Sequence, residues 1–232
     1  MKFAQGRAGV LAGTGSNCTD EAIELTANAK KIGANSCLLA TPYYNRPTQE
    51  GLYRHFRKIA ESVDIPLVLY NIPSRTGVNI LPETVARLSE IPNIAGIKEA
   101  SGSLGQVTDI RRLTKGKFAI LSGDDSLFLP MMSVGGVGVI SVLSNILVKD
   151  LRELYTAFLV EKDVAKATGI HTHLAPLIQA MFIETNPIPV KEALYLTGMI
   201  EREYRLPLCP MSEQNRETLA QTLAEYGLIS KG

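Results

Sequence analysis

The sequence predicts an α/β fold with a parallel sheet, followed by a helical C-terminal region. Short apolar runs recur along the chain, amphipathic segments with helix-start signals separate them, and the apolar runs stop after Leu143. Strands and helices that alternate in this way form parallel strands joined by crossover helices. We therefore expect a sheet of six strands.

The expected strands are almost entirely apolar and do not alternate with polar residues, which is typical of strands buried on both faces. They are Gly9–Gly13, Ser36–Thr41, Pro66–Ile72, Ile94–Ala100, Phe118–Gly123 and Gly136–Leu143.

The expected helices between them begin with capping or acidic residues, which a helix N-terminus favours. Among them are Ala22–Ile32, Leu52–Ser62 and Thr84–Leu88. After Leu143 no further strand is expected, and the predicted helices are Val148–Leu159, Lys162–Met181, Pro189–Leu196 and Ser212–Glu225.

Two architectures fit this order, an open doubly wound sheet and a (β/α)8 barrel of the TIM type. Polar groups follow nearly every apolar run, among them Thr14, Tyr70, Lys98 and Asp124. Convergence of such groups from many strand ends favours the barrel, whose C-terminal mouth collects them. Six units do not close a ring of eight. We expect a partial barrel with the active site over residues 1–161 and a helical appendage over residues 162–232.

Composition excludes several classes of protein. Hydrophobic residues make up 45% and charged residues 20%, and the net charge is +1, so no basic surplus indicates a nucleic-acid partner. The three cysteines are far apart in the sequence, which argues against a disulfide framework or a metal knuckle. No apolar run reaches the roughly 18 residues of a membrane span, and the N-terminus lacks a signal-peptide core. We expect a cytoplasmic protein without a metal knuckle.

Lys98 is the sharpest candidate for catalysis, because it ends a run that otherwise reads as a buried strand. Period-two alternation puts Gly96 on the same face, where a glycine would leave room for a small ligand. A desolvated lysine has a lowered pKa, and its neutral amine can form a Schiff base with a ketone. The alternative is a strand-end lysine that points into solvent.

Tyr70 and Arg75 strengthen this hypothesis. Tyr70 falls at a strand end, where its phenol can relay protons near Lys98, and Arg75 is expected in the following loop, where a guanidinium suits a carboxylate. A core tyrosine and a surface arginine remain the alternatives.

Two segments carry a resemblance to a known family. LYNIPSRTG, with Tyr70, and IAGIKEASG, with Lys98, resemble the dihydrodipicolinate synthase family. ATPYYNRPTQEGLYRHF, LSGDDS, GGVGVIS, NPIPVKEAL and REYRLPLCP continue the resemblance in order, over essentially the whole chain.

The resemblance implies a class I aldolase that condenses pyruvate with L-aspartate 4-semialdehyde in lysine and diaminopimelate biosynthesis. Lys98 would form the Schiff base, Tyr70 would relay protons, and Tyr44 would reach into a neighbouring subunit's site. Arg75 would hold the carboxylate of the semialdehyde. No cofactor beyond the covalent Schiff base is implied, and the assembly would be a homotetramer or a homodimer.

The resemblance also implies two groups of binding residues. Gly123 and Ile140 resemble backbone positions that line the pyruvate site. Asn17, Glu21 and Tyr43 resemble part of an interface pocket in which lysine inhibits some members.

The sequence departs from the family in one respect. Members begin with two further βα units and a Gly-Thr-Thr-Gly-Glu loop whose threonines bind the pyruvate carboxylate, and no Gly-Thr-Thr-Gly occurs here. We therefore expect a barrel without its first two βα units, and a chain that is by itself a poor catalyst.

Two rival functions remain. The first is another pyruvate-dependent aldolase of the N-acetylneuraminate lyase superfamily, although Arg75 and Tyr44 favour a short carboxylate acceptor over a polyol. The second is a non-catalytic, truncated binding form.

Overall fold

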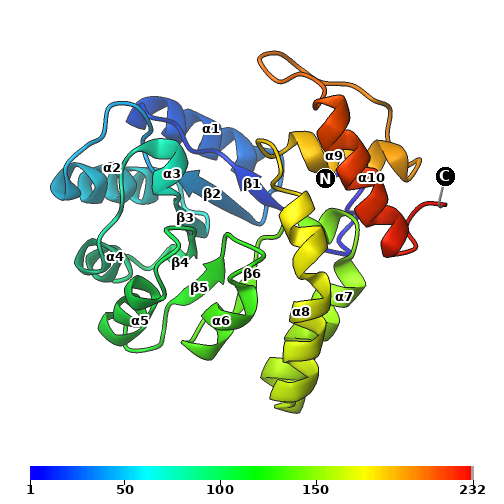
Figure 1. Ribbon diagram of the computed structural model, residues 1–232. Helices are drawn as coiled ribbons and strands as arrows, with labels where there is room; N and C mark the ends of the chain where they lie inside the picture. Colours follow the sequence, from blue (N-terminus) through cyan, green and yellow to red (C-terminus); the bar gives the residue numbers. More distant parts are fainter. Residues whose placement is uncertain (231–232) are drawn as a thin grey trace. The chain divides into compact units, whose positions relative to one another are not determined.

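The sheet has six parallel strands in sequential order, β1 to β6, in a computed structural model that describes residues 1–230 (Figure 1). Each strand therefore pairs with the next one along the chain, as expected for successive βα units. The strands are β1 (Leu11–Gly13), β2 (Ser36–Ala40), β3 (Leu67–Asn71), β4 (Ile94–Glu99), β5 (Ala119–Ser122) and β6 (Gly138–Val139).

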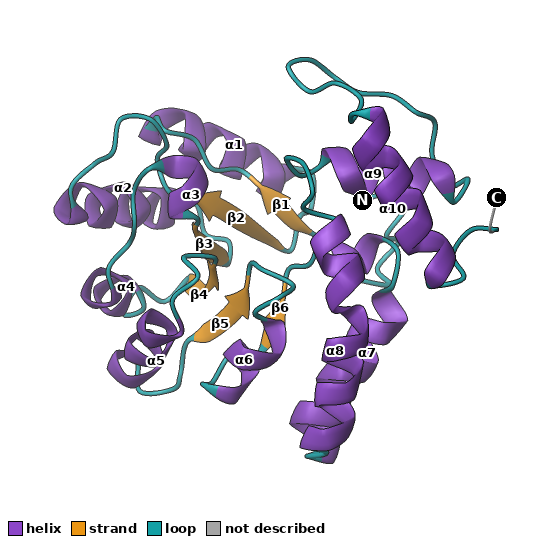
Figure 2. Cartoon of the chain, viewed as in Figure 1, coloured by secondary structure: helices purple, strands orange, loops and turns teal. Residues whose placement is uncertain are grey.

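Helices follow the strands and cover one side of the sheet (Figure 2). The core lies between these layers, where Leu69 and Ile97 of the strands and Phe56 of a helix are fully buried. The helices of this part of the chain are α1 (Thr19–Lys31), α2 (Gln49–Ser62), α3 (Pro73–Thr76), α4 (Pro82–Leu88), α5 (Leu104–Leu113) and α6 (Phe128–Ser133).

Side-chain caps fix where two of these helices begin. The hydroxyl of Thr48 accepts a hydrogen bond from the backbone N–H of Gly51 at the start of α2, and Ser103 does the same for Gln106 at the start of α5. Each cap satisfies an N–H group that has no partner within its helix. These caps therefore define the first turns of α2 and α5.

Two local expectations were wrong. The last strand was expected to run to Leu143, but β6 ends at Val139 and a short 3-10 helix, η1 (Leu143–Asn145), follows. Arg75 was expected in a loop but lies in the short helix α3. This helix ends at Gly77, whose φ of 76° is in the left-handed region that glycine adopts at low cost.

The chain divides into two compact units, residues 1–140 and residues 141–232. The second unit is helical, as the sequence predicted, and α7 packs against α8 within it. The division between the two compact units falls before α7. The start of the helical appendage at residue 162 stays a prediction. The further elements of the second unit are α7 (Val148–Tyr155), the π-helical segment η2 (Thr156–Glu161), α8 (Val164–Ala180), α9 (Ile188–Leu196) and α10 (Glu213–Glu225).

A buried carboxylate organises the helical unit. Glu192 of α9 is fully buried and accepts hydrogen bonds from Arg202 Nε at 3.0 Å, Arg216 Nε at 2.8 Å and Tyr204 Oη at 2.6 Å. A buried charge is tolerated when it is paired and hydrogen-bonded in this way. The cluster ties α9 to α10 and to the segment between them.

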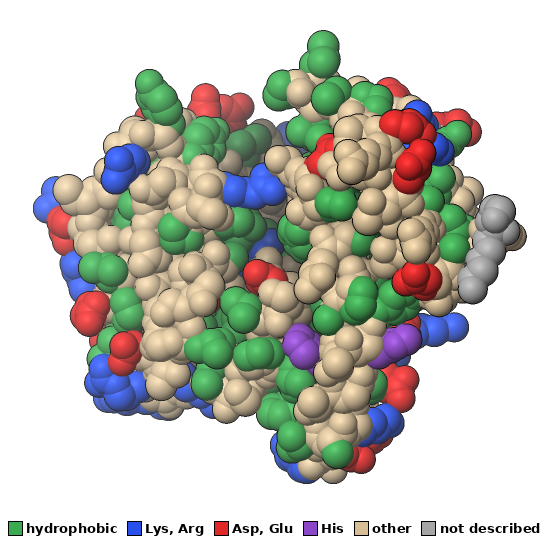
Figure 3. All heavy atoms as spheres, in the orientation of Figure 1, with side chains coloured by type: hydrophobic (Ala, Val, Ile, Leu, Met, Phe, Trp, Pro, Cys, Tyr) green, Lys and Arg blue, Asp and Glu red, His purple; other side chains and the backbone are tan. Residues whose placement is uncertain are grey.

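The surface carries charges of both signs. On the face drawn in Figure 3, basic and acidic side chains are interspersed. Among the helices of residues 1–230, none is long and apolar enough to cross a membrane.

Candidate active site

Lys98 and Tyr70 lie side by side on neighbouring strands. They are Cα partners in the parallel ladder between β3 and β4, and Lys98 Nζ lies 4.0 Å from the centroid of the Tyr70 ring. Successive side chains of a strand point to opposite faces, so the next pair in the ladder, Asn71 and Glu99, points to the other face. The sequence proposed Lys98 and Tyr70 as partners, and the structure brings them into contact.

The surroundings of this pair favour its neutral forms. Burial lowers the pKa of the Lys98 amine, and the charge of Arg75 lowers it further, whereas the carboxylate of Asp125 raises it. Burial raises the pKa of the Tyr70 phenol, and Arg75 opposes this shift. A neutral amine is a nucleophile and a protonated phenol is a proton donor, so both shifts are in the direction that favours imine formation.

Gly123 leaves the space beside the Lys98 side chain. A Cβ at this position would lie 3.0 Å from Lys98 Cε and 2.7 Å from the Cβ of Ala100. Its backbone N–H donates to the carbonyl of Glu99 at 2.8 Å, which fixes the turn after β5 against β4. Any side chain here would press on the lysine.

Gly96 is close to the backbone of the neighbouring strand β5, not to an open space. A Cβ on Gly96 would lie 2.6 Å from the carbonyl oxygen of Ala119 on β5. The space is therefore taken by the close approach of β5 rather than left open for a ligand. The expectation of ligand space at Gly96 was wrong, and Gly123 is the glycine that lies against Lys98.

Ile140 continues the edge on which these residues lie. Its backbone N–H donates to the carbonyl of Ser122 at 2.9 Å, which extends the ladder between β5 and β6 by one residue. Gly123 and Ile140 thus follow adjacent strand ends, where the backbone of each is held by the neighbouring strand.

Arg75 lies close enough to the pair for its charge to act on both members. Arg75 is in the last turn of α3, shortly after β3, and it is exposed. A guanidinium in this position presents a fork of donors that matches a carboxylate.

Tyr44 is not brought together with Lys98 and Tyr70 within residues 1–230. Its side chain is 91% exposed, and its φ of 71° is in the left-handed region, which is uncommon for a tyrosine. Such backbone geometry persists where the surroundings impose it. An aromatic side chain held out in solvent is available to another molecule.

The three residues expected in a lysine pocket belong to the same unit. Asn17 lies in the loop after β1, Glu21 in the first turn of α1, and Tyr43 in the loop after β2. Glu21 accepts a hydrogen bond from the hydroxyl of Ser16 at 2.6 Å, and the carbonyl of Asn17 accepts one from Asn45 Nδ2 at 3.0 Å. The second bond joins the loop after β1 to the loop after β2, which contains Tyr43. Tyr43 is exposed, like its neighbour Tyr44.

Sequence reasoning missed the role of Asp125. Asp124 and Asp125 both follow β5, and Asp124 Oδ1 accepts hydrogen bonds from the N–H and hydroxyl of Ser126. Asp125, in contrast, is 1% exposed and its charge acts on Lys98. Because Asp124 and Asp125 are adjacent in the sequence and chemically identical, the sequence did not indicate which of the two is buried.

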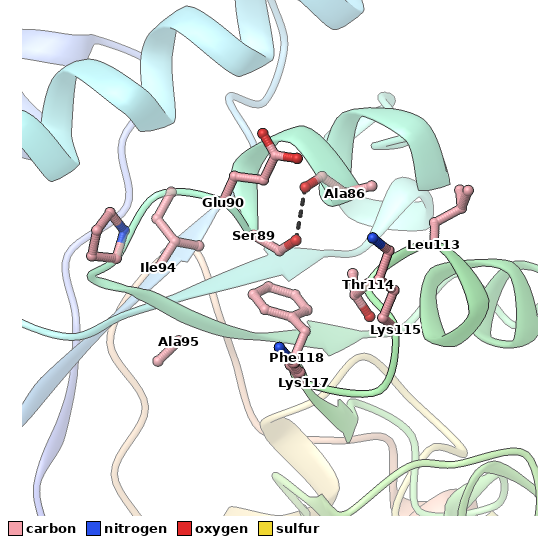
Figure 4. A pocket seen from close by; sticks show the side chains of 11 residues that line it. Ala86, Ser89, Glu90, Ile94, Ala95, Leu113, Thr114, Lys115, Lys117 and Phe118 are labelled. Carbon is pink, nitrogen blue, oxygen red and sulfur yellow. Dashed lines mark hydrogen bonds between the residues drawn. The ribbon is translucent and has the colours of Figure 1, made fainter.

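A separate cavity of about 410 Å³ lies at the other end of the strands (Figure 4). Its lining includes Ile94 at the start of β4, Phe118 before β5 and two lysines, Lys115 and Lys117. The hydroxyl of Ser89 is already used, since it donates to the carbonyl of Ala86 at 2.7 Å. Within residues 1–230, no three His, Cys, Asp or Glu side chains form a group that could hold a metal ion.

Comparison with known proteins relates this geometry to a family. A model of the dihydrodipicolinate synthetase family matches residues 1–226. The 4-hydroxy-tetrahydrodipicolinate synthase of Thermodesulfovibrio yellowstonii is 56% identical over 230 residues, which are 99% of this chain and 78% of that protein.

Two solved structures are similar throughout. The chloride-inhibited dihydrodipicolinate synthase of Acinetobacter baumannii, in complex with pyruvate, is 47% identical with a TM-score of 0.95, and the match covers 98% of this chain and 78% of that one. A dihydrodipicolinate synthase described as the first monomeric variant is 45% identical with a TM-score of 0.96, over 98% of this chain and 77% of that one.

Proposed function

Because the chain belongs to the dihydrodipicolinate synthetase family, we propose that it condenses pyruvate with L-aspartate 4-semialdehyde to 4-hydroxy-tetrahydrodipicolinate, in lysine and diaminopimelate biosynthesis. The observation that carries the proposal is the contact of Lys98 Nζ with the ring of Tyr70 at 4.0 Å, in surroundings that lower the pKa of the amine. The chain is then a lyase that works through a Schiff base.

Lys98 begins the reaction as a neutral amine. Its nitrogen attacks the ketone carbon of pyruvate, and the carbinolamine that forms loses water to give an imine. Tyr70 donates the proton that the departing hydroxyl group needs. The imine then accepts the electron pair left when the methyl group of pyruvate loses a proton, and the resulting enamine carbon attacks the aldehyde carbon of the semialdehyde, whose oxygen takes up a proton to become the hydroxyl group. The amino group of the semialdehyde then attacks the imine carbon and displaces the Lys98 amine, which closes the ring and frees the product. Because the imine itself is the electron sink, the reaction needs no metal and no organic cofactor.

The remaining residues bind the two substrates. Gly123 and Ile140 line the pyruvate site with backbone atoms, and Gly123 provides the room for the ketone carbon beside Lys98. Arg75 binds the carboxylate of the semialdehyde through paired hydrogen bonds, because its charge already reaches the catalytic pair. Asp125 balances the cationic charge that Lys98 carries as an iminium.

Tyr44 completes the proton relay in the site of a second copy of the chain. Its 91% exposure and left-handed backbone support this role, since the side chain is held away from its own unit. The assembly is then a homodimer or a homotetramer in the cytoplasm. A solved relative is a monomeric variant, so the number of subunits is to be measured, by light scattering on the purified chain.

Asn17, Glu21 and Tyr43 form part of a pocket for lysine, the end product of the pathway. The carboxylate of Glu21 suits an ammonium group, and the hydrogen bond between the two loops holds Asn17 near Tyr43. Calorimetric titration with lysine tests this, with Glu21→Gln as the variant that loses binding.

The sheet of β1 to β6 corresponds to six of the eight strands of a (β/α)8 barrel, and in a closed barrel two more strands would join β6 to β1. The match to 78% of the Thermodesulfovibrio yellowstonii protein supports a shorter arc of the same fold. A closed ring leaves no sheet edge, whereas β1 and β6 are the two edges of the sheet in residues 1–230.

Turnover decides between this function and its rivals. The purified chain is incubated with pyruvate and L-aspartate 4-semialdehyde, and in parallel with N-acetylneuraminate. The proposal expects product only from the first pair. Cleavage of N-acetylneuraminate would identify another aldolase of the superfamily, and binding of pyruvate without product from either would identify a binding form.

A further inference from the structure

A network of buried polar side chains lies directly behind the catalytic pair. Asn71 follows Tyr70 on β3, Glu99 follows Lys98 on β4, and the two are Cα partners. Asn71 is fully buried and Glu99 is 2% exposed. Asn71 Nδ2 donates to Glu99 Oε2 at 3.0 Å and to Oε1 at 3.3 Å, so the side chains join the two strands on the face opposite Lys98 and Tyr70.

The carboxylate of Glu99 is surrounded by hydrogen-bond donors. Oε1 accepts from the backbone N–H of Ser101 at 2.6 Å, and Oε2 accepts from Gln106 Nε2 at 3.1 Å. None of the ion pairs within the described part of the chain includes Glu99, so amide groups alone compensate its buried charge. A buried carboxylate without a cationic partner is costly, and it persists where its donors are rigidly held.

The network joins four segments of the chain, namely β3, β4 with the loop after it, α5, and the segment before α4. Gln106 belongs to α5 and exchanges hydrogen bonds with Asn79, which precedes α4, at 2.8 and 3.1 Å. Asn79 Oδ1 also accepts from Asn71 Nδ2 at 2.7 Å, and Asn71 Oδ1 accepts from the N–H of Ile80 at 3.1 Å. The ends of β3 and β4 are therefore fastened to each other and to both flanking helical segments.

We propose that Glu99 and Asn71 are positioning residues that set the orientation of Lys98 against Tyr70. The inference rests on the proposed function, in which Lys98 and Tyr70 must meet one substrate carbon together. Backbone atoms adjacent to the network carry both catalytic side chains, so a shift of Asn71 against Glu99 moves Tyr70 against Lys98 by a similar amount. Misplacement of reacting groups by about 1 Å can slow a reaction by as much as about a hundredfold.

Exchange of amide and carboxylate groups tests the network without a change of volume. Glu99→Gln puts an amide nitrogen against N–H donors in either orientation, and Asn71→Asp puts a second carboxylate against Glu99. The double variant restores one amide and one carboxylate across the strands. Asn93→Ala is the matched control, since Asn93 lies at the other end of β4 and holds the carbonyls of Ala60 and Val63 at 2.9 and 3.2 Å.

Three readouts are taken at a temperature at which every variant is folded. They are the rate at which borohydride traps pyruvate on the chain, the KM for each substrate, and the acetylation of Lys98 by acetic anhydride, which needs no substrate. We expect each single variant to be trapped about tenfold to a hundredfold more slowly, with altered Lys98 acetylation and an unchanged KM for the semialdehyde. The double variant should recover to within about threefold, because the two changes are coupled. Asn93→Ala should lose thermal stability alone.

The outcomes separate the two proposals. Single variants that are less stable but react at the wild-type rate would overturn the positioning role, as would a folded double variant without recovery. A wild type that borohydride does not trap would overturn the proposed function instead. Lys98 acetylation would then decide the positioning role by itself, and acetylation equal in all variants would count against it.

Discussion

Lys98 Nζ lies 4.0 Å from the centroid of the Tyr70 ring, and the two residues are directly paired in the ladder between β4 and β3. This contact requires the observed register of β3 against β4, because a slip of one strand by one residue would move its side chains to the other face of the sheet. The chemistry of the site therefore depends on the strand pairing itself.

Arg75→Ala should weaken the use of L-aspartate 4-semialdehyde far more than imine formation with pyruvate. A lost charge-assisted contact to a carboxylate is worth about 2 to 3 kcal/mol, which corresponds to a fall in kcat/KM of about 30-fold to 150-fold. Steady-state kinetics with each substrate varied in turn measures this. An unchanged dependence on the semialdehyde would assign Arg75 to the surface.

Gly123→Ala should slow imine formation, since the new Cβ would lie 3.0 Å from Lys98 Cε and 2.7 Å from the Cβ of Ala100. Gly105→Ala is the control, because its Cβ would meet only the Ser103 hydroxyl at 3.7 Å, and alanine favours a helix. We expect Gly105→Ala to be as active as the wild type and slightly more stable. Equal trapping rates in both variants would show that the space at Gly123 is not used.

The rate of imine formation should rise with pH to a plateau. The midpoint of the rise should lie below pH 10.5, because burial lowers the pKa of Lys98 from that value. Asp125→Asn should move the midpoint further down, since this carboxylate raises the pKa of Lys98. Arg75→Ala should move it up, since this guanidinium lowers the pKa. Trapping rates over a pH series measure all three, and shifts of the opposite sign would refute the electrostatic account.

His55 should make the fold sensitive to acid. Burial lowers its pKa from 6.5 to about 4, so the unfolded state binds a proton more readily than the folded state between these values. Stability is then fully present above pH 6.5 and is lost as the pH falls toward 4, by about 3 kcal/mol at most. Urea unfolding of wild type and His55→Asn over this range isolates the contribution as the difference between the two curves. Parallel curves would exclude it.

Glu192→Gln should lower the free energy of unfolding by about 3 kcal/mol, because it leaves two arginines beside a neutral buried amide. The pKa of Glu192 is held below its ordinary value, although burial, the largest influence on it, acts in the opposite direction. The hydrogen bonds from Tyr204, Arg216 and Arg202 outweigh that influence. Thermal unfolding followed by circular dichroism measures the loss. A melting temperature within error of the wild type would contradict it.

The strands could be predicted from the sequence where a run is apolar and bounded by polar residues. The run Ser36–Thr41 contains β2 (Ser36–Ala40) and differs from it by one residue. The predicted end of the last strand at Leu143 was wrong. The apolar residues of this run continue past Val139, the last paired residue of β6, so hydrophobicity alone did not indicate where the strand ends. The short helix α3 was missed because four residues are too few to show a helical period.

The site could be predicted only in part, for a related reason. A strand end with a lysine and another with a tyrosine gave the candidates, but their contact follows from the register, which no single segment contains. Asn71 and Glu99 looked like ordinary polar residues at strand ends, and their burial depends on α5 and on the segment before α4. A network whose members come from several segments can be recognised only once the fold has brought those segments together.

Mass spectrometry of the borohydride-reduced chain tests the central claim most directly. After incubation with pyruvate, the account predicts one pyruvate-derived adduct, located on the peptide that contains Lys98, and none in Lys98→Ala. An adduct on another lysine, or an equal adduct in Lys98→Ala, would contradict the account.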